Sequence, residues 1–165
     1  MTPVAAIARR TSMPSPRIKL NVDVLRNPAW VCFVWFGLTA GASLLAVPAI
    51  FSAESATRAV SLDVARSVFE LLGKAELILL VMLLTLVRVT DQAGRLWAWC
   101  AVLALIMIAQ VAWLIPELSA RTDSILGGVE PPPSIAHAAY SISGLVKLAC
   151  LFILGVMTSK GRPSG

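Results

Sequence analysis

Residues 66–87 read RSVFELLGKAELILLVMLLTLV, and this stretch decides the fold. Its first half carries charged side chains, whereas the part after Glu76 is almost entirely apolar, and no proline interrupts it. About 20 apolar residues are enough for a helix to cross the hydrocarbon core of a bilayer. The stretch therefore predicts a membrane helix that brings charges into the bilayer, where the rest of the chain must bury them.

The composition of the whole chain excludes a water-soluble globule. Of its 165 residues, 58% are hydrophobic and 14% are charged, and the mean hydropathy is +0.81. A soluble domain is roughly one-quarter charged. The net charge of +5 could point to nucleic acid, but the basic residues lie beside long apolar runs, as in membrane proteins. We therefore expect the lipid bilayer, and not nucleic acid, as the partner of this chain.

Apolar runs recur along the sequence and predict an all-α, polytopic membrane protein. We expect one transmembrane domain over residues 28–159, preceded by a basic, mostly disordered cytoplasmic tail over 1–27 and followed by a short cytoplasmic tail over 160–165. The second helix should begin near Leu62 and stop at Arg88, and the third should end at Pro116. The four predicted transmembrane helices cover about residues 29–51, 65–87, 96–115 and 138–158.

The distribution of lysine and arginine predicts the orientation of these helices. If both termini are cytoplasmic, nine basic residues lie inside and three lie outside, while Lys74 and Lys147 fall within the spans. Short cytoplasmic segments of membrane proteins carry an excess of such residues. The chain is therefore predicted to be N-in and C-in, as a multi-pass protein of the cell inner (plasma) membrane.

Polar residues within the spans predict a polar interior. Glu76 lies 12 residues before Arg88. Lys147 lies 13 residues before Lys160. At about 1.5 Å per residue, both lie roughly 18–20 Å above the cytoplasmic boundary, near the middle of a core about 30 Å thick. We expect Glu76 and Lys147 to face each other, closed in by Gln110 and Tyr140. The predicted intramembrane polar centre comprises Glu76, Lys147, Gln110, Tyr140, Lys74 and Glu70.

Four charged residues before Glu76 are spaced as one helical stripe with alternating signs. Asp63, Arg66, Glu70 and Lys74 follow one another at intervals of three, four and four. Pairs four residues apart, such as Arg66–Glu70 and Glu70–Lys74, can form ion pairs along a helix. Glu76 points away from this stripe and needs a partner on another helix. We therefore interpret the stripe as structural.

The sequence contains no recognisable metal or cofactor motif. Its three cysteines, without a C-x-x-C pair, are interpreted as small buried hydrophobes. A lone histidine cannot form a two-histidine metal site or a bis-histidine haem site within one chain. His137 is interpreted as a capping or interfacial residue, with one haem ligand completed by a partner as the alternative. We predict no metal and no cofactor. Because hydrolase and nucleotide-binding motifs are absent, an enzyme is the weakest hypothesis.

The first apolar segment carries packing signals. Gly37 and Gly41 are four residues apart, so they face the same way and permit a close helix neighbour. Trp30 and Trp35 lie toward its start, where membrane proteins place an aromatic belt.

These residues resemble the TMEM205-like family of small four-helix membrane proteins. That family has a glycine-rich first helix that ends in an apolar-Pro-x-apolar-Phe motif, and this chain has AVPAIF at 46–51. Val68 and Phe69 in the next helix, with Glu76, fit the same pattern, as does His137 near the start of the last helix. The resemblance covers residues 29–158 and implies a four-helix fold, without implying an activity or functional residues.

Two functions fit these features. The first is an oligomeric module that binds or passes a proton, an ion or a small solute, because ionisable residues within membrane spans usually mark such sites. The Glu76–Lys147 centre would carry it. The alternative is a structural or assembly subunit of a larger membrane complex, docked through its N-terminal tail and its Gly37–Gly41 face. Either function predicts a homo-oligomer or a subunit of a membrane complex.

Overall fold

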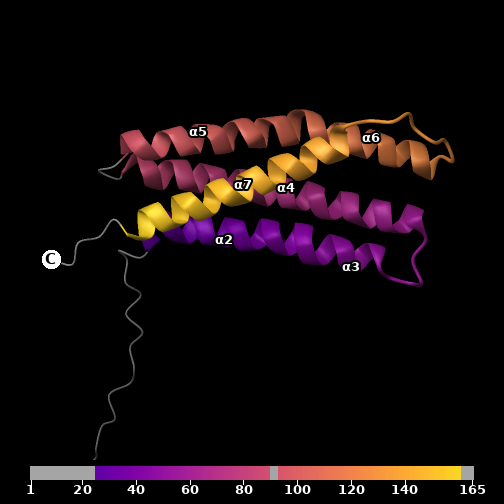
Figure 1. Cartoon of the computed structure of the whole chain (residues 1–165), viewed down its shortest axis with the longest axis horizontal. Helices are drawn as coiled ribbons and strands as arrows, with labels where there is room; N and C mark the ends of the chain where they lie inside the picture. The colour runs from indigo at the N-terminus through magenta and orange to yellow at the C-terminus, as the bar shows by residue number, and fades with distance from the viewer. Residues whose placement is uncertain (1–24, 90–92, 161–165) are drawn as a thin grey trace, which may run out of the picture.

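The computed structural model describes residues 25–89 and 93–160, and the regular structure in both ranges is entirely helical. The predicted all-α class is therefore confirmed. The tail predicted over residues 1–27 lies almost wholly outside the described residues, and so do residues 161–165 of the C-terminal tail. The helices join into long rods that lie side by side (Figure 1).

The first rod contains α2 (Pro28–Ala40), the π-helical segment η1 (Gly41–Ala46) and α3 (Val47–Phe51). It begins where the side chain of Asn27 accepts a hydrogen bond, 2.9 Å long, from the backbone N–H two residues on, which satisfies a donor that the first helical turn leaves free. The π segment ends two residues before Pro48, whose ring excludes an ordinary hydrogen bond to the preceding turn. Widening that turn lets the rod continue past the proline.

The next helix, α4 (Arg58–Arg88), is a single helix of 31 residues, which corresponds to about 46 Å. Thr57 caps its start, because its side-chain oxygen accepts a hydrogen bond from the N–H of Val60 at 3.4 Å. The helix therefore begins four residues before the predicted Leu62. The cap, and not the onset of apolar residues, fixes this boundary.

The third rod contains α5 (Ala93–Ala109), η2 (Gln110–Leu114) and α6 (Ile115–Leu126). The prediction that Pro116 ends this helix is wrong. A π-helical segment again ends two residues before the proline, as it does in the first rod, and its wider turn accommodates the missing hydrogen bond. The rod ends instead before Gly128, whose φ of 77° lies in the left-handed region that favours glycine.

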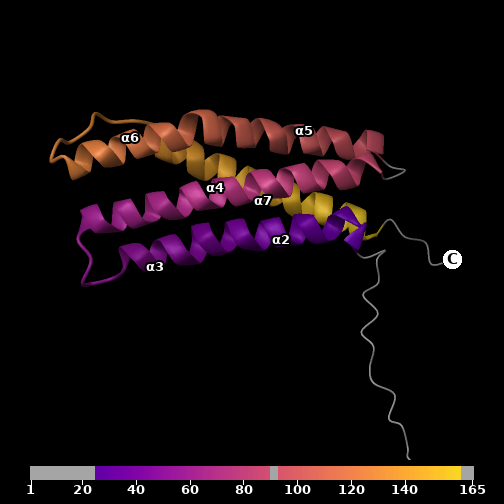
Figure 2. The same ribbon diagram turned by 180° about the vertical axis from the view of Figure 1, so that it is seen from behind.

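The last helix, α7 (Ala136–Ser159), crosses one side of the molecule and packs mainly against α2, with further contacts to α5 and η2 (Figure 1). Seen from behind, α4 lies between the first and third rods (Figure 2). The start of α2 and the end of α7 meet at one end of the molecule, where Asn27 Nδ2 donates a hydrogen bond to the carbonyl oxygen of Thr158 at 3.4 Å.

The helices approach each other at glycines other than those predicted. A Cβ atom added to Gly37 or Gly41 would meet nothing within 4 Å. At Gly155 of α7, an added Cβ would lie 3.0 Å from two ring carbons of Phe33 on α2. The predicted close neighbour of Gly37 and Gly41 is therefore absent within the described chain. The reason is the rotation of α2, which turns Trp35 inward and the glycines outward.

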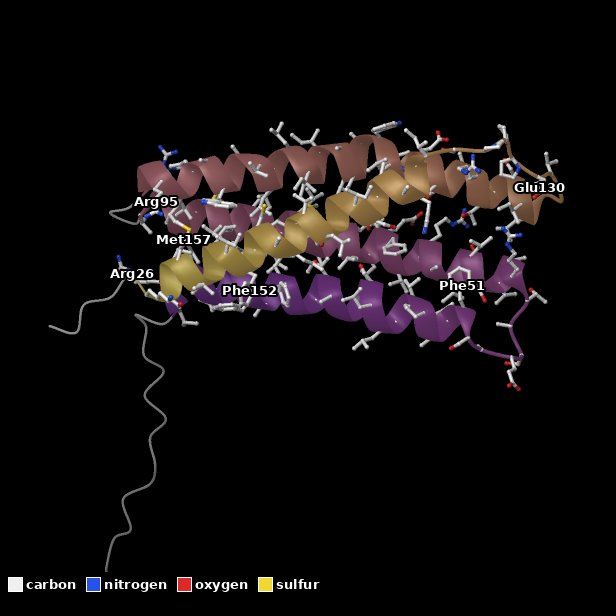
Figure 3. All side chains as sticks on the ribbon, in the orientation of Figure 1. Arg26, Phe51, Arg95, Glu130, Phe152 and Met157 are labelled. Carbon is white, nitrogen blue, oxygen red and sulfur yellow. The ribbon has the colours of Figure 1, made fainter. Side chains whose placement is uncertain are left out.

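Many large apolar side chains on the rods are exposed, and side chains stand out from the outer faces of the helices in Figure 3. In three helices, only 22%, 28% and 33% of the most apolar window is buried inside the molecule. A protein dissolved in water rarely leaves so much apolar surface uncovered, so the chain is a multi-pass membrane protein. The helices long and apolar enough to cross a membrane are Pro28–Phe51, Gly94–Leu126 and Ala136–Ser159.

α4 does not belong to that group of three, because charged residues occupy its apolar half. Lys74, Glu76 and Arg88 all lie between residues 71 and 88. The fourth predicted span therefore depends on how those charges are accommodated.

Candidate functional site

Two oppositely charged side chains meet in the interior, between α4 and α7. Lys147 Nζ donates a hydrogen bond to Glu76 Oε2 at 2.7 Å and forms an ion pair with it. Each residue is only 1% exposed. Glu76 shares the buried face of α4 with Leu72, Leu79 and Leu83. Burying this apolar stripe therefore carries the carboxylate into the interior.

The other carboxylate oxygen of Glu76 receives two hydrogen bonds from α2. Trp35 Nε1 donates to Oε1 at 3.0 Å, and Thr39 Oγ1 donates to the same atom at 2.6 Å. Placing Trp35 in an interfacial aromatic belt is wrong, because the residue is 0% exposed. A buried indole needs a hydrogen-bond acceptor, and the carboxylate supplies it. The four-residue spacing of Trp35 and Thr39, two donors on one helix face, is the sequence pattern that could have revealed them.

The lysine side of the pair is closed by η2 and α7. Lys147 Nζ donates to Gln110 Oε1 at 2.7 Å and lies 3.9 Å from Met107 Sδ. Gln110 Nε2 in turn donates to Ser143 Oγ at 2.8 Å, and Ser143 Oγ donates to the carbonyl oxygen of Tyr140 at 2.9 Å. Gln110 is the first residue of η2. One network thus connects α2, α4, η2 and α7.

The centre is enclosed, and its polar groups are paired. Gln110 is, like the two ions, 1% exposed, and no buried side-chain nitrogen or oxygen in the described part of the chain lacks a hydrogen-bond partner. An unpaired charge at the bilayer centre costs at least about 2.5–3.5 kcal/mol, and removing one partner of a buried pair costs about 3–5 kcal/mol. The network therefore resists any helix movement that would separate its members.

The side chains of three residues predicted for the centre take no part in its hydrogen bonds. Tyr140 is buried, but its ring packs edge-on against Phe69 with centroids 5.1 Å apart, and no hydrogen bond of its hydroxyl to the ion pair is present in residues 25–89 and 93–160. Glu70 and Lys74 are exposed. They precede Glu76 by six and two residues, which places them roughly 200–240° away around the helix. The assignment of Glu70 and Lys74 to the polar centre is therefore wrong.

The charged stripe of α4 also pairs differently from the prediction. Arg66 donates to Asp63 at 2.7 Å and to Asp123 of α6. Within the described ranges, no ion pair joins Arg66 to Glu70, or Glu70 to Lys74. The reason is tertiary, because α6 packs beside α4 and brings a second carboxylate to Arg66. Arg66 therefore connects two helices, and Glu70 and Lys74 are left without it.

His137 lies apart from the centre. It is exposed in the first turn of α7, ten residues before Lys147, which is about 15 Å along the helix. Its carbonyl oxygen accepts a hydrogen bond from Ser141 Oγ at 3.0 Å. The cysteines are buried and free, and the described residues contain no group of three or more His, Cys, Asp or Glu side chains suited to a metal ion. His137 is therefore near an end of the rods and away from the charged pair.

The fold and this centre define an all-helical, multi-pass membrane protein with a buried ion-pair network. In comparisons with protein-family models, with curated proteins and with solved structures, no match to the chain was found. The resemblance to the TMEM205-like family therefore stays a prediction, and the geometry of the centre is the basis on which a function is proposed.

Proposed function

We propose that this chain is a four-span protein of the cell inner (plasma) membrane that acts as a structural or assembly subunit of a larger membrane complex. One observation carries the proposal. Glu76 and Lys147 are 1% exposed, and each is held by partners from several helices. A centre closed in this way fixes the helices in one register and offers a solute no entry in this conformation.

The four-span arrangement is supported by the pairing of the α4 charge. Because the carboxylate of Glu76 is paired, its charge is compatible with a position of α4 in the bilayer. The 31 residues of α4 also exceed the roughly 20 that a span needs. The N-in, C-in orientation is supported by the basic residues, because Arg26 and Arg95 lie at one end of the molecule and Glu130 at the other (Figure 3).

Labelling from outside tests the orientation. A cysteine introduced at Glu54, which is exposed beyond α3, should react with a membrane-impermeant thiol reagent in intact cells. A cysteine at Lys160 should react only after the membrane is opened. The native cysteines are buried and provide a low background. The reverse pattern would overturn the orientation.

Purification from the native membrane tests the assembly role. The tagged chain, cross-linked in the membrane and extracted in mild detergent, should run as a complex of constant composition. The double variant Glu76→Gln with Lys147→Met removes both charges together, and replacing a buried ion pair by apolar or neutral groups is often close to neutral. It should therefore enter the same complex. A monomer in native membranes would overturn the proposal.

A second candidate is the permeation module, in which a proton, an ion or a small solute passes through the Glu76–Lys147 centre. The observation that favours it is local. Gln110, which accepts a hydrogen bond from Lys147, begins a π-helical segment, and such segments are frequent at functional sites. An ammonium and a carboxylate 2.7 Å apart can also exchange a proton.

Proton flux separates the two candidates. The purified chain in liposomes that enclose a pH-sensitive dye should give no flux above that of protein-free liposomes if the centre is structural. A flux that is present in the wild type and lost in the Glu76→Gln, Lys147→Met double variant would establish the second candidate and overturn the first.

A further inference from the structure

A shallow groove of about 370 Å³ lies on the outside of the molecule, between α4 and the η2–α6 part of the third rod. Glu70 and Lys74 line one side, and Ile115 and Pro116 line the other. Gly73 lies between the two charged residues at the base, where an added Cβ atom would come within 3.3 Å of the Ile115 side chain. The groove is thus apolar apart from two exposed charges of opposite sign and a serine.

Those two charges lie at membrane depth if α4 spans the bilayer, and the inference rests on that part of the proposed function. Counted from Arg88 at about 1.5 Å per residue, Lys74 is roughly 21 Å and Glu70 roughly 27 Å above the inner boundary of a core about 30 Å thick. Both side chains are exposed. Charges facing hydrocarbon are unfavourable and normally find a partner.

The chain itself does not supply that partner. Glu70 and Lys74 are four residues apart, an arrangement in which a helix often forms an ion pair, yet none joins them within residues 25–89 and 93–160. Arg66, one turn before Glu70 on α4, is occupied by Asp63 and Asp123. One free carboxylate and one free ammonium therefore remain on the same face, one turn apart.

We infer that this face of α4 is the interface of a parallel homodimer, in which Lys74 of each copy pairs with Glu70 of the other. A two-fold axis along the membrane normal places the same patch opposite itself, so every contact occurs twice. Glu70 and Lys74 differ in height by about 6 Å, a distance that the extended lysine side chain covers. The face is thus complementary in charge to a second copy of itself.

The apolar part of the same stripe supports a protein partner. Leu77 and Val81 follow Glu70 at seven and eleven residues and are 40% and 63% exposed, so the stripe continues toward the inner side with the spacing of a helix–helix seam. An anionic lipid headgroup would satisfy Lys74 but would be repelled by Glu70. A second copy satisfies both charges and covers the apolar residues below them.

Charge exchange in the full-length chain tests the pairing. Two differently tagged copies, coexpressed in one membrane, should copurify and should show energy transfer between fluorescent labels after reconstitution. Glu70→Lys alone and Lys74→Glu alone place like charges opposite each other, so each should lose self-association at least about tenfold. A Glu70→Lys copy mixed with a Lys74→Glu copy should associate again, and so should the double variant Glu70→Lys with Lys74→Glu.

Glu54→Lys is the matched control, because it makes the same change of charge at an exposed site outside the groove and should leave association unchanged. Each variant is first shown to insert into the membrane and to keep the wild-type helix content by circular dichroism. If a single exchange does not accumulate, Glu70→Gln and Lys74→Gln replace it, and each should still weaken self-association.

Single exchanges that associate like the wild type would overturn the inference. So would a chain that stays monomeric while Lys74→Gln lowers its retention of anionic lipid, because the groove would then bind lipid. A chain that never pairs with itself but still enters a constant heteromeric complex in its native membrane would overturn the homodimer and leave the proposed assembly role standing.

Discussion

Glu76 and Lys74 lie two residues apart on α4, yet the structure gives them opposite environments. Glu76 is buried and receives hydrogen bonds from α2 and α7. Lys74 is exposed beside a groove on the outer surface of α4. Two residues turn a helix by about 200°, so neighbours in sequence reach opposite faces. The helix face, and not the position along the chain, therefore decides whether a charged side chain of α4 is paired in the interior or exposed on the outer surface.

The largest effect is expected from breaking the buried pair on one side only. Glu76→Gln or Lys147→Met leaves the other ion enclosed without its partner, so each should lower the free energy of unfolding by about 3–5 kcal/mol. Unfolding titrated with denaturing detergent in mixed micelles measures this loss. Lys160→Met, at the exposed end of α7, is the matched control and should change the free energy of unfolding by less than about 0.5 kcal/mol.

The double variant Glu76→Gln with Lys147→Met sharpens that comparison. It removes both charges, so its loss of stability should be clearly smaller than the sum of the two single losses. Losses that add would show that Glu76 and Lys147 do not interact. The interaction that fixes the helices against one another would then lie elsewhere in the core.

A smaller loss is expected when a donor to Glu76 is removed. Trp35→Phe keeps an aromatic side chain, but it replaces the indole by a smaller ring and deletes the N–H that binds Oε1, and a hydrogen bond to a charged group contributes about 1.5–3 kcal/mol. The same detergent titration measures it. Trp30→Phe is the control, because Trp30 donates only to the backbone carbonyl of Leu25 at the surface. Equal losses for the two variants would contradict a stabilising hydrogen bond from Trp35 to Glu76.

Helix packing gives a prediction of intermediate size. Gly155→Ala places a methyl group 3.0 Å from the Phe33 ring, and overpacking of this kind costs typically about 1–3 kcal/mol. Gly37→Ala meets nothing within 4 Å and should not lower stability. Unfolding temperatures of the two variants in one detergent compare them. A greater loss at Gly37 would move the close helix contact to the face that the sequence predicted.

The smallest effect is expected at Tyr140. Its ring packs on Phe69, and its hydroxyl takes no part in the described hydrogen bonds of the ion pair. Tyr140→Phe should therefore change the free energy of unfolding by less than about 0.5 kcal/mol. A loss comparable to that of Trp35→Phe would show that the Tyr140 hydroxyl interacts with the ion pair.

Only part of this site could be predicted from the sequence. Depth along a helix depends only on the rise per residue, so Glu76, Lys147 and Gln110 were brought together correctly by counting. Which residues of one helix face another depends on the rotation of each helix about its own axis. The first span is only weakly periodic, so the sequence does not predict its rotation. Trp35 and Thr39 were therefore not predicted as part of the site. Tyr140 was predicted to close it, although its ring packs on Phe69 instead.

The prolines show the same division. A proline removes one backbone donor, and the sequence reads that as a kink or an end. Whether the helix continues depends on whether the surrounding turns can compensate for the missing hydrogen bond. Both rods that contain such a proline accommodate it with a π-helical segment that ends two residues earlier, before Pro48 and before Pro116.

The sequence by itself determined that this chain is helical and has helices apolar enough for a membrane, and it determined the positions of Glu76 and Lys147 along their helices. Both follow from local quantities, namely hydropathy and the rise of a helix. Only the tertiary structure decided which charges are buried and which donors surround them. Packing of one helix on another selects a single rotation for each, and that choice gave Glu76 its partners and left Glu70 and Lys74 exposed.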